Sequence, residues 1–433
     1  MKVKFKRKKE PVNTTFKLPG DKSIAHRALI IGALGKGDYV ISNFPRSLDC
    51  MSTLCCMKEI GVSVEVDHDR VHVSSPGYKY FLKKAGVLNS NNSGTTARLI
   101  SGLVAGCGIE CSIDGDNSLR KRPMDRVIDP LKLMGAKIEA EKGLLPMTFK
   151  SNKGLTDIEY LMPVSSAQVK SCILIAGFLG KGKTKVIEKE SSRDHTERMF
   201  SALGADIHTN GKEICIKNSL ITVKDMHIPG DISSAAFLIA CAILSEAAEI
   251  VIRDVLLNQG RRKYLDMLKK MGANLEYKVN VLENGEEAGD IFVKSSKLRA
   301  IIISEEEVPN IIDEIPMLSV LAAFSSGKTI IRGINELKFK ESNRVKAIVE
   351  NLRLSGINVT SSGDCIEIMG TDEYISKDIC INPYNDHRIA LAFTALALRN
   401  LRETVISNWE CTNISFPNAI EYFKEFAVVS IHE

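Results

Sequence analysis

Apolar residues along the chain recur in one repeated arrangement. A turn of Gly, Asp, Asn or Ser precedes a helix rich in small apolar residues, and this arrangement begins at residues 20, 92, 165, 230, 313 and 385. A run rich in β-branched residues follows each helix, as in DYVISNF or KTIIRGI, and an amphipathic helix comes next. The pattern predicts six repeats that account for nearly the whole chain.

The second helix of five repeats is expected to end at a glycine, because glycine adopts the left-handed conformation that closes a helix. These glycines are Gly61, Gly135, Gly204, Gly272 and Gly356. Alternating strands such as VSVEV and AKIEA follow them. Each repeat is therefore predicted to be a βαβαββ unit.

The first helix of each repeat is apolar on nearly all sides, as in AAFLIACAIL, which places it inside a domain with the sheets wrapped outside. Six repeats are too many for one domain and suit two domains of three repeats each. The IPGDISS segment near residue 230 is the predicted boundary between them. The expected fold class is thus α/β.

The composition is that of an ordinary globular protein, with 433 residues, 44% hydrophobic and 26% charged. A net charge of +5 is too small for this length to indicate a nucleic-acid surface. The basic start MKVKFKRKKE lacks the apolar stretch of a signal peptide and is predicted to form a solvated strand edge. The longest apolar stretches are shorter than the ~18–20 residues that a membrane span needs.

Eleven cysteines, an odd number without any CxxC pair, favour reduced core thiols over disulfides. The sequence therefore predicts a cytoplasmic protein. The pair Cys107 and Cys111 has no histidine partners, so we expect no metal site there.

Charged and hydroxyl side chains gather at the starts of the apolar helices. If three of these helices lie parallel in a domain, their N-termini supply free N–H groups and partial positive charge, which bind anions. Ordinary capping explains any single copy equally well. The charges of the first copy favour an anion site, because Lys22, Ser23 and Arg27 lie together at the head of one helix.

The second and third copies supply further donors. Gly94 lets a ligand approach the backbone closely. Arg122 ends an Arg-Lys-Arg run, which is either a solvated loop or part of the anion site. Ser165, Ser166 and Gln168 are neutral groups suited to hydroxyls and phosphate oxygens.

The fifth and sixth copies carry acids and bases. Asp313 begins a helix in an apolar stretch, where it is either a cap or a general base. The later motifs add Lys340, Glu341, Arg344, Asp386, His387 and Arg388. Arg122, Arg344 and Arg388 can together bind two anionic groups of one small substrate, which predicts chemistry on a phosphorylated carboxylic acid.

Seven motifs occur in the order and at the spacing of one known family. They are LPGDKSIAHRA, NSGTTARL, DGDNSLRKRPMDRV, SSAQVKS, SRDHTER, KFKESNR and NDHRIALAF. From about residue 16 to residue 425 the chain resembles 5-enolpyruvylshikimate-3-phosphate synthases. The resemblance implies a two-domain inside-out α/β barrel, the enolpyruvyl transferase fold, with residues 21–228 in the N-terminal domain and residues 1–20 and 229–433 in the C-terminal domain.

The resemblance also implies a reaction. The enolpyruvyl group of phosphoenolpyruvate is transferred to the 5-hydroxyl of shikimate 3-phosphate through a tetrahedral ketal, and phosphate is released without a metal or organic cofactor. This is a step of the shikimate pathway to chorismate and the aromatic amino acids.

Individual roles follow from the matching positions. The shikimate 3-phosphate side comprises Lys22, Ser23, Arg27, Ser165, Ser166, Gln168, Asp313 and Lys340. The phosphoenolpyruvate side comprises Lys22, Gly94, Arg122, Gln168, Arg344 and Arg388. Asp313 is expected to deprotonate the hydroxyl, Glu341 to protonate the methylene carbon and Lys22 to neutralise the departing phosphate. His387 is expected to act as an orienting partner in the site rather than to transfer a proton directly.

Two positions depart from the common family pattern. Asn343 stands where many members have Asp, and Ile414 stands where many have a lysine on the phosphoenolpyruvate side. Together with Ala167 and the RKRPM loop, they place the chain with the family's more divergent group. Glyphosate occupies the phosphoenolpyruvate site in this family; Gly94 leaves room for it, whereas the missing lysine suggests tolerance, so the sequence leaves the response open.

Two other functions remain as alternatives. A UDP-N-acetylglucosamine enolpyruvyl transferase would share the fold, but that family has Lys-Asn in its first motif and a reactive cysteine in a glycine-rich loop. This chain has Lys22-Ser23 and no cysteine in residues 114–123. A non-catalytic RNA-binding protein would need aromatic platforms, and the chain has one Trp and 6% aromatics. We expect a monomer acting on small molecules, with no nucleic acid or membrane partner.

Overall fold

The computed structural model describes residues 1–432. The chain forms two compact units. Unit 1 comprises Met1–Leu18, Gly230–Val281 and Glu287–Glu433, and unit 2 comprises Pro19–Pro229 and Leu282–Glu286.

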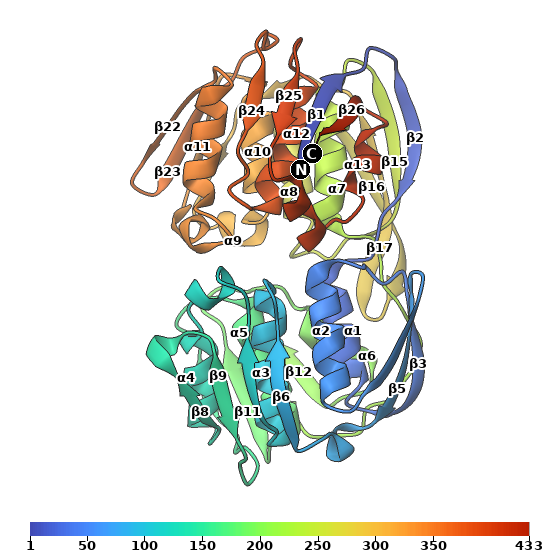
Figure 1. The fold of residues 1–433 in the computed structure, drawn as a ribbon, viewed down its shortest axis with the longest axis vertical. Coiled ribbons are helices and arrows are strands. Elements are labelled where there is room, and N and C mark those ends of the chain that lie inside the picture. Colours follow the sequence, from blue (N-terminus) through green and yellow to red (C-terminus); the bar gives the residue numbers. More distant parts are fainter. Residues whose placement is uncertain (433) are drawn as a thin grey trace. The chain divides into compact units, whose positions relative to one another are not determined.

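Helices rich in small apolar residues form the interior of unit 2 (Figure 1). They are α1 (Lys22–Gly32), α3 (Gly94–Cys107) and α5 (Ala167–Leu179). α3 and α5 pack very closely, since a Cβ added to Gly102 would lie 2.3 Å from the Cys172 carbonyl oxygen. This contact brings the starts of the two helices together.

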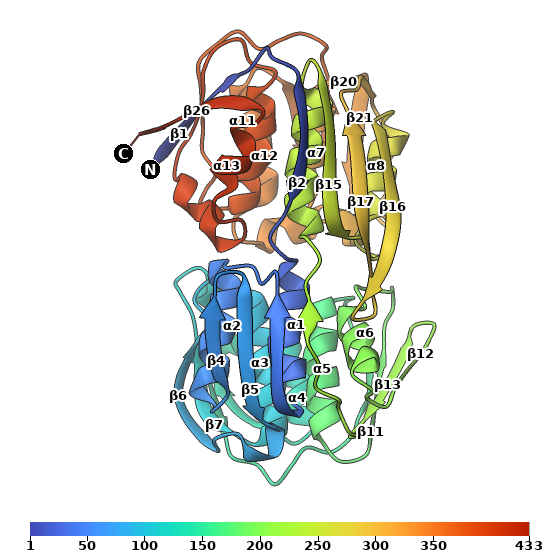
Figure 2. The ribbon, with the colours of Figure 1, turned by 90° about the vertical axis from the view of Figure 1, so that its right-hand side faces the viewer.

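Four-stranded sheets cover the internal helices of unit 2, and Figure 2 shows β3, β4 and β5 on their outside. The first sheet has the order β14 (Met226–His227), β3 (Lys36–Ser42), β5 (Arg70–Pro76), β4 (Ser63–Asp67). The second has the order β6 (Lys84–Asn89), β7 (Glu110–Asp114), β9 (Met147–Lys150), β8 (Lys137–Ala140). The third has the order β10 (Glu159–Leu161), β11 (Lys183–Ile187), β13 (Glu213–Lys217), β12 (Ile207–Asn210).

Unit 1 repeats this plan around three further buried helices. They are α7 (Ile232–Leu244), α10 (Ile315–Ala322) and α12 (His387–Ala397). Its first two large sheets are β16 (Asn274–Glu283), β17 (Glu286–Lys294), β15 (Ala248–Leu256), β2 (Val12–Lys17), and β19 (Ile302–Ile303), β21 (Lys328–Arg332), β23 (Cys365–Met369), β22 (Asn358–Ser362). The third is β24 (Ile379–Ile381), β25 (Thr404–Ile406), β1 (Lys2–Arg7), β26 (Ala427–His432). β18 (Leu298–Arg299) pairs with β20 (Ser325–Ser326).

Each of the six large sheets joins a parallel pair of strands to antiparallel neighbours. In unit 2, for example, β14 runs parallel to β3, whereas β5 is antiparallel to both β3 and β4. The alternation of buried Val71 and Val73 with exposed His72 and Ser74 explains why one face of β5 covers the helices. The α/β prediction with helices inside and sheets outside is confirmed.

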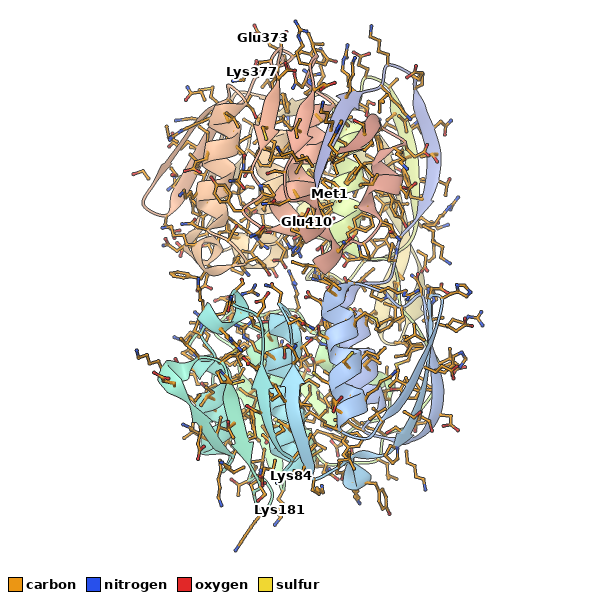
Figure 3. The ribbon with its side chains drawn as sticks, in the orientation of Figure 1. Met1, Lys84, Lys181, Glu373, Lys377 and Glu410 are labelled. Atoms are coloured by element: carbon orange, nitrogen blue, oxygen red, sulfur yellow. The ribbon has the colours of Figure 1, made fainter. Side chains whose placement is uncertain are left out.

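The prediction that the basic N-terminal segment is a strand edge is wrong. β1 pairs with β25 on one side and with β26 on the other, so it lies within its sheet. Val3 and Phe5 are fully buried. The many lysines made this segment look solvated. Val3 and Phe5 alternate with these lysines, however, and this alternation gives the strand one apolar face. The amino group of Met1 pairs with Glu410, 3.2 Å away (Figure 3).

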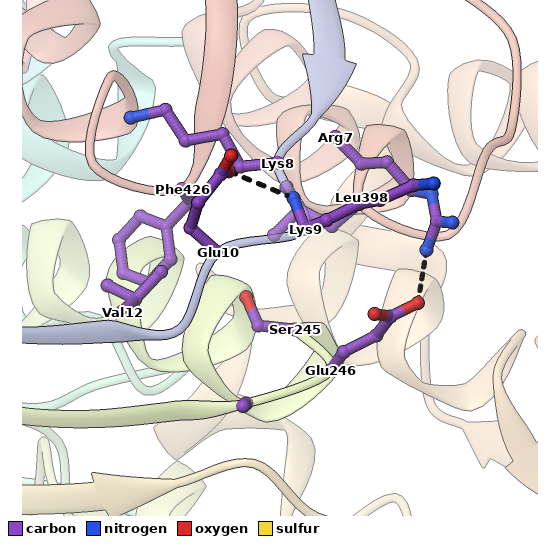
Figure 4. A pocket seen from close by; sticks show the side chains of 10 residues that line it. Arg7, Lys8, Lys9, Glu10, Val12, Ser245, Glu246, Leu398 and Phe426 are labelled. Atoms are coloured by element: carbon purple, nitrogen blue, oxygen red, sulfur yellow. Dashed lines mark hydrogen bonds and ion pairs between the residues drawn. The ribbon is translucent and has the colours of Figure 1, made fainter.

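The turn after β1 is fixed to the end of α7. Arg7 forms an ion pair with Glu246, and Figure 4 shows its guanidinium directed at that carboxylate. The Arg7 guanidinium also lies 4.8 Å from the centre of the Tyr374 ring. These contacts hold the end of β1 against Glu246 and Tyr374.

The amphipathic helices end as predicted. They are α2 (Leu48–Glu59), α4 (Asp125–Leu133), α6 (His195–Ala202), α8 (Lys263–Lys270) and α11 (Arg344–Leu354). The five glycines that follow have φ between 84° and 98°. The amide after each glycine donates to a carbonyl five residues earlier, as Val62 does to Met57 at 3.1 Å. This is the Schellman ending of a helix.

The remaining helices are short. They are α9 (Val308–Ile311), α13 (Ala419–Phe423) and the 3-10 turns η1 (Tyr78–Tyr80), η2 (Leu119–Lys121), η3 (Glu141–Gly143), η4 (Asn335–Phe339) and η5 (Trp409–Ile414). Within the described part of the chain, none of the helices combines the length and the apolar character needed to cross a membrane.

Candidate active site

The starts of α1, α3 and α5 carry one cluster of predicted site residues, which we call the unit 2 cluster. It contains Lys22, Ser23, Arg27, Gly94, Arg122, Ser165, Ser166 and Gln168. Asp21 caps α1 by accepting hydrogen bonds from the amides of Ser23 (2.7 Å) and Ile24 (3.1 Å).

Lys22 is held by an acid that sequence reasoning missed. Its Nζ lies 2.6 Å from Oδ2 of Asp49, which belongs to α2, and both side chains are largely buried. Nothing in the motif around Asp49 marks it, because the pair depends on how α2 packs against α1. An anion that reaches Lys22 therefore competes with a carboxylate already in place.

Gly94 keeps a space open between two guanidinium groups. A Cβ at this position would lie 3.0 Å from Nη1 of Arg98 and 3.5 Å from Nη1 of Arg122. Arg98 also donates to Oε1 of Gln168 at 2.5 Å, and Gln168 Nε2 donates to Thr95 Oγ1 at 2.9 Å. These hydrogen bonds join the starts of α3 and α5.

The three cations before Pro123 do not act together. Arg120 forms a bidentate ion pair with Asp114, at 2.9 and 2.6 Å, and Lys121 is exposed. Arg122 instead lies beside Gly94 and donates to Oδ1 of Asn92 at 2.7 Å. Of the three, Arg122 is therefore the cation that lies beside Gly94, while Arg120 pairs with Asp114.

Arg27 is bound by the protein on every nitrogen. It donates from Nε to Thr196 Oγ1 (2.7 Å), from Nη2 to Ser171 Oγ (2.8 Å) and from Nη1 to the Ser23 carbonyl (2.8 Å). Burial lowers the pKa of Arg27 to about 10, although Glu197 opposes this change. Arg27 remains a cation at neutral pH.

A second group of predicted residues, the unit 1 cluster, surrounds Arg344. It contains Asp313, Lys340, Glu341, Arg344 and Arg388, with Asp386 and His387. Arg344 is 1% exposed and contacts Asp386 Oδ2 (2.8 Å) and Glu341 Oε2 (2.6 Å). Burial lowers the pKa of this guanidinium, but Asp386 and Glu341 outweigh burial, and the pKa lies above its ordinary value.

Asp313 lies between two arginines. Its Oδ1 is 3.6 Å from Arg344 Nη1, and its Oδ2 is 3.7 Å from Arg388 Nη2. Arg388 also donates to the Asp313 carbonyl at 3.0 Å. The N-cap position of α10 falls to Glu314, so Asp313 does not occupy the capping position.

Asp386 is a structural centre of the unit 1 cluster. It is fully buried, accepts from the Arg388 amide at 2.9 Å and so caps α12. Ser342 Oγ donates to it at 3.1 Å. His387, the first residue of α12, is also buried.

The two departures from the common pattern have different consequences. Asn343 caps α11 by accepting from the Lys346 amide at 3.1 Å, a role that Asp would fill equally well. Ile414 is half-buried at the end of η5. This position therefore contributes no cation to unit 1.

The chain is similar to known proteins over nearly its whole length. The model of the EPSP synthase (3-phosphoshikimate 1-carboxyvinyltransferase) family matches residues 6–423. The 3-phosphoshikimate 1-carboxyvinyltransferase of Clostridium tetani is 54% identical over 418 residues, covering 96% of this chain and 95% of the relative. That of Caldicellulosiruptor saccharolyticus is 42% identical over 427 residues, covering 97% and 98%. A solved structure of EPSP synthase from Acinetobacter baumannii has a TM-score of 0.89 at 35% identity and covers 99% of this chain and 100% of that chain.

Buried helices inside sheets, repeated three times in each of two units, define the two-domain enolpyruvyl transferase fold. Within that class the chain belongs to the EPSP synthase (3-phosphoshikimate 1-carboxyvinyltransferase) family. It is an enzyme of the shikimate pathway that transfers the enolpyruvyl group of phosphoenolpyruvate to shikimate 3-phosphate. The UDP-N-acetylglucosamine alternative is not favoured.

Proposed function

We propose that the unit 2 cluster and the unit 1 cluster serve this one reaction. Shikimate 3-phosphate binds Lys22, Ser23, Arg27, Ser165, Ser166, Gln168, Asp313 and Lys340. Phosphoenolpyruvate binds Lys22, Gly94, Arg122, Gln168, Arg344 and Arg388. The observation that carries the proposal is Asp313, a carboxylate set between two guanidiniums at 3.6 and 3.7 Å.

The chemistry needs an acid and a base at different atoms. Asp313 takes the proton of the 5-hydroxyl of shikimate 3-phosphate while the hydroxyl oxygen forms a bond to C2 of phosphoenolpyruvate. Glu341, held by Arg344 at 2.6 Å, gives a proton to the methylene carbon. The resulting ketal then loses phosphate and a methyl proton, which restores the enol ether, while Lys22 neutralises the departing charge.

Asp313→Asn tests the base. The variant keeps the shape and the hydrogen-bonding capacity of the side chain, so kcat should fall at least about 100-fold, as loss of a general base does. Asp114→Asn is the matched control, since Asp114 also pairs with an arginine but lies outside both clusters. Equal kcat values for Asp313→Asn and the wild type would exclude Asp313 as the base.

We also propose that the enzyme is a cytoplasmic monomer with domain limits at 21–228 and at 1–20 plus 229–433. Two compact units, separated near residues 18–20 and 229–230, support these limits. Both clusters come from one chain, which supports the monomer. Free thiols at the eleven cysteines suit a reducing compartment. Glyphosate is proposed to compete for the space beside Gly94.

A further inference from the structure

Unit 2 contains a buried ionic cluster that the proposed chemistry does not use. Lys170 lies one turn into α5, and its side chain is 1% exposed. Its Nζ is 2.8 Å from Oε2 of Glu188 and 2.6 Å from Oε1 of Glu197, and both carboxylates are buried. Three ionised groups in one apolar interior carry a large desolvation cost.

Arg27 interacts electrostatically with this cluster. The attraction of Glu197 raises the pKa of Arg27 against the effect of burial. Burial lowers the pKa of Lys170, but Glu197 and Glu188 raise it further, so Lys170 stays protonated. Glu197 therefore lies between the Lys170 ammonium, 2.6 Å from its carboxylate, and Thr196, which accepts a hydrogen bond from Arg27.

Lys170 fastens a segment that touches the proposed substrate-binding residues. We call residues 188–197 the 188–197 segment. Lys170 Nζ donates to the Ser192 carbonyl at 3.4 Å, while Glu188 Oε1 accepts from the Ser192 amide at 3.1 Å. The Lys170 ammonium therefore binds both Glu188 and the Ser192 carbonyl, and so ties both ends of the turn at residues 188–192 to α5.

The same segment orders two groups of the unit 2 cluster. The Glu190 amide donates to Ser165 Oγ at 3.0 Å, which leaves the Ser165 hydroxyl hydrogen to point elsewhere. Thr196 Oγ1 accepts from Arg27 Nε at 2.7 Å and lies 2.6 Å from Ser171 Oγ. A shift of the segment would therefore remove the amide that binds Ser165 Oγ and the hydroxyl that orients Arg27 Nε.

We propose that Lys170 is a positioning residue for shikimate 3-phosphate. Its ammonium fixes the 188–197 segment against the first turns of α5 and so sets Ser165 and Arg27 for the substrate. Stability alone does not explain the cluster, because well-packed apolar replacements of buried ion pairs are often neutral or stabilising. The inference rests on the proposed function of the unit 2 cluster.

Lys170→Met tests the role, since methionine fills similar space without the charge. The KM for shikimate 3-phosphate should rise at least about 10-fold, as small displacements of binding groups produce, while the KM for phosphoenolpyruvate changes less than about 3-fold. Leu174→Ala is the control: Leu174 is fully buried in the same helix, so this variant loses stability without losing the ionic contacts. It should leave both KM values near those of the wild type.

The double variant Lys170→Met/Glu188→Gln distinguishes a positioning role of Lys170 from a role in charge balance alone. Removing one carboxylate relieves the unpaired charge, so the double variant should regain thermal stability and yet keep the raised KM for shikimate 3-phosphate. Recovery of that KM together with stability would overturn the inference, as would equal increases of both KM values in Lys170→Met. If Lys170→Met does not fold, Glu188→Gln alone should raise the same KM selectively, and an unchanged KM there overturns the inference.

The wild type keeps the two claims distinguishable. If the wild type turns over shikimate 3-phosphate and Lys170→Met has the same kinetic constants, the positioning role alone is overturned. Absence of wild-type turnover would overturn the proposed function and the positioning role with it.

Discussion

At the scale of single residues, Arg344 is already surrounded by negative charge. It contacts the carboxylates of Asp386, Glu341 and Asp313. An anionic group of phosphoenolpyruvate that reaches Arg344 must therefore compete with carboxylates already in place.

Gly94→Ala tests the space beside Arg122. The added methyl would lie 3.0 Å from the end of the Arg98 side chain, which can shift, so the protein should fold normally. Loss of the ligand's room should raise the KM for phosphoenolpyruvate about 10-fold, equal to ~1.4 kcal/mol of binding. It should raise the inhibition constant of glyphosate at least as much. Steady-state kinetics with phosphoenolpyruvate varied would refute this if the KM stayed unchanged.

The reactivity of its thiols distinguishes this enzyme from one that uses a catalytic cysteine. Burial raises the pKa of Cys50 and Cys56 to about 12, so these thiols stay protonated and unreactive at neutral pH. Cys55 and Cys380 are exposed. Iodoacetamide followed by peptide mass spectrometry should find these two modified first, with activity retained. Loss of activity in step with one alkylated cysteine would contradict the proposed mechanism.

At the scale of elements, local signals predicted helices better than strands. The Asp21 and Asp231 caps and the five glycine endings are visible in the sequence, because each is fixed by a residue next to the helix it ends. The neighbours of β1 are not visible, because β25 and β26 lie about 400 residues away along the chain. Long-range pairing of this kind is set by packing and not by local pattern.

Gly135→Ala tests the helix endings. Gly135 has a φ of 97° and open space around a new Cβ, so any cost comes from the backbone alone. Alanine in the left-handed region should destabilise the protein by ~1–2 kcal/mol, measured as a lower urea midpoint. Gly86→Ala is the control, because Gly86 also has open space but no positive φ. Equal urea midpoints for the two variants would mean that the left-handed glycine at the helix end contributes nothing to the stability of the protein.

At the scale of the whole molecule, the motifs predicted which residues gather at helix starts but not how they pair. The Arg98–Gln168 contact joins two different repeats, and the Lys22–Asp49 contact joins two helices of the first repeat, so no single motif contains either pair. The ionic cluster of Lys170 was equally hidden, because its partners Glu188 and Glu197 lie outside the SSAQVKS motif. Charge pairing inside a core depends on the packed repeats together.

The central claim is that the two clusters act on shikimate 3-phosphate and phosphoenolpyruvate. The most direct measurement is phosphate release from phosphoenolpyruvate by the wild type with shikimate 3-phosphate, with UDP-N-acetylglucosamine or with no acceptor. Release should require shikimate 3-phosphate and should be at least about 100-fold slower in Asp313→Asn, which lacks the base. Release with UDP-N-acetylglucosamine instead, or none with shikimate 3-phosphate from folded protein, would contradict the account.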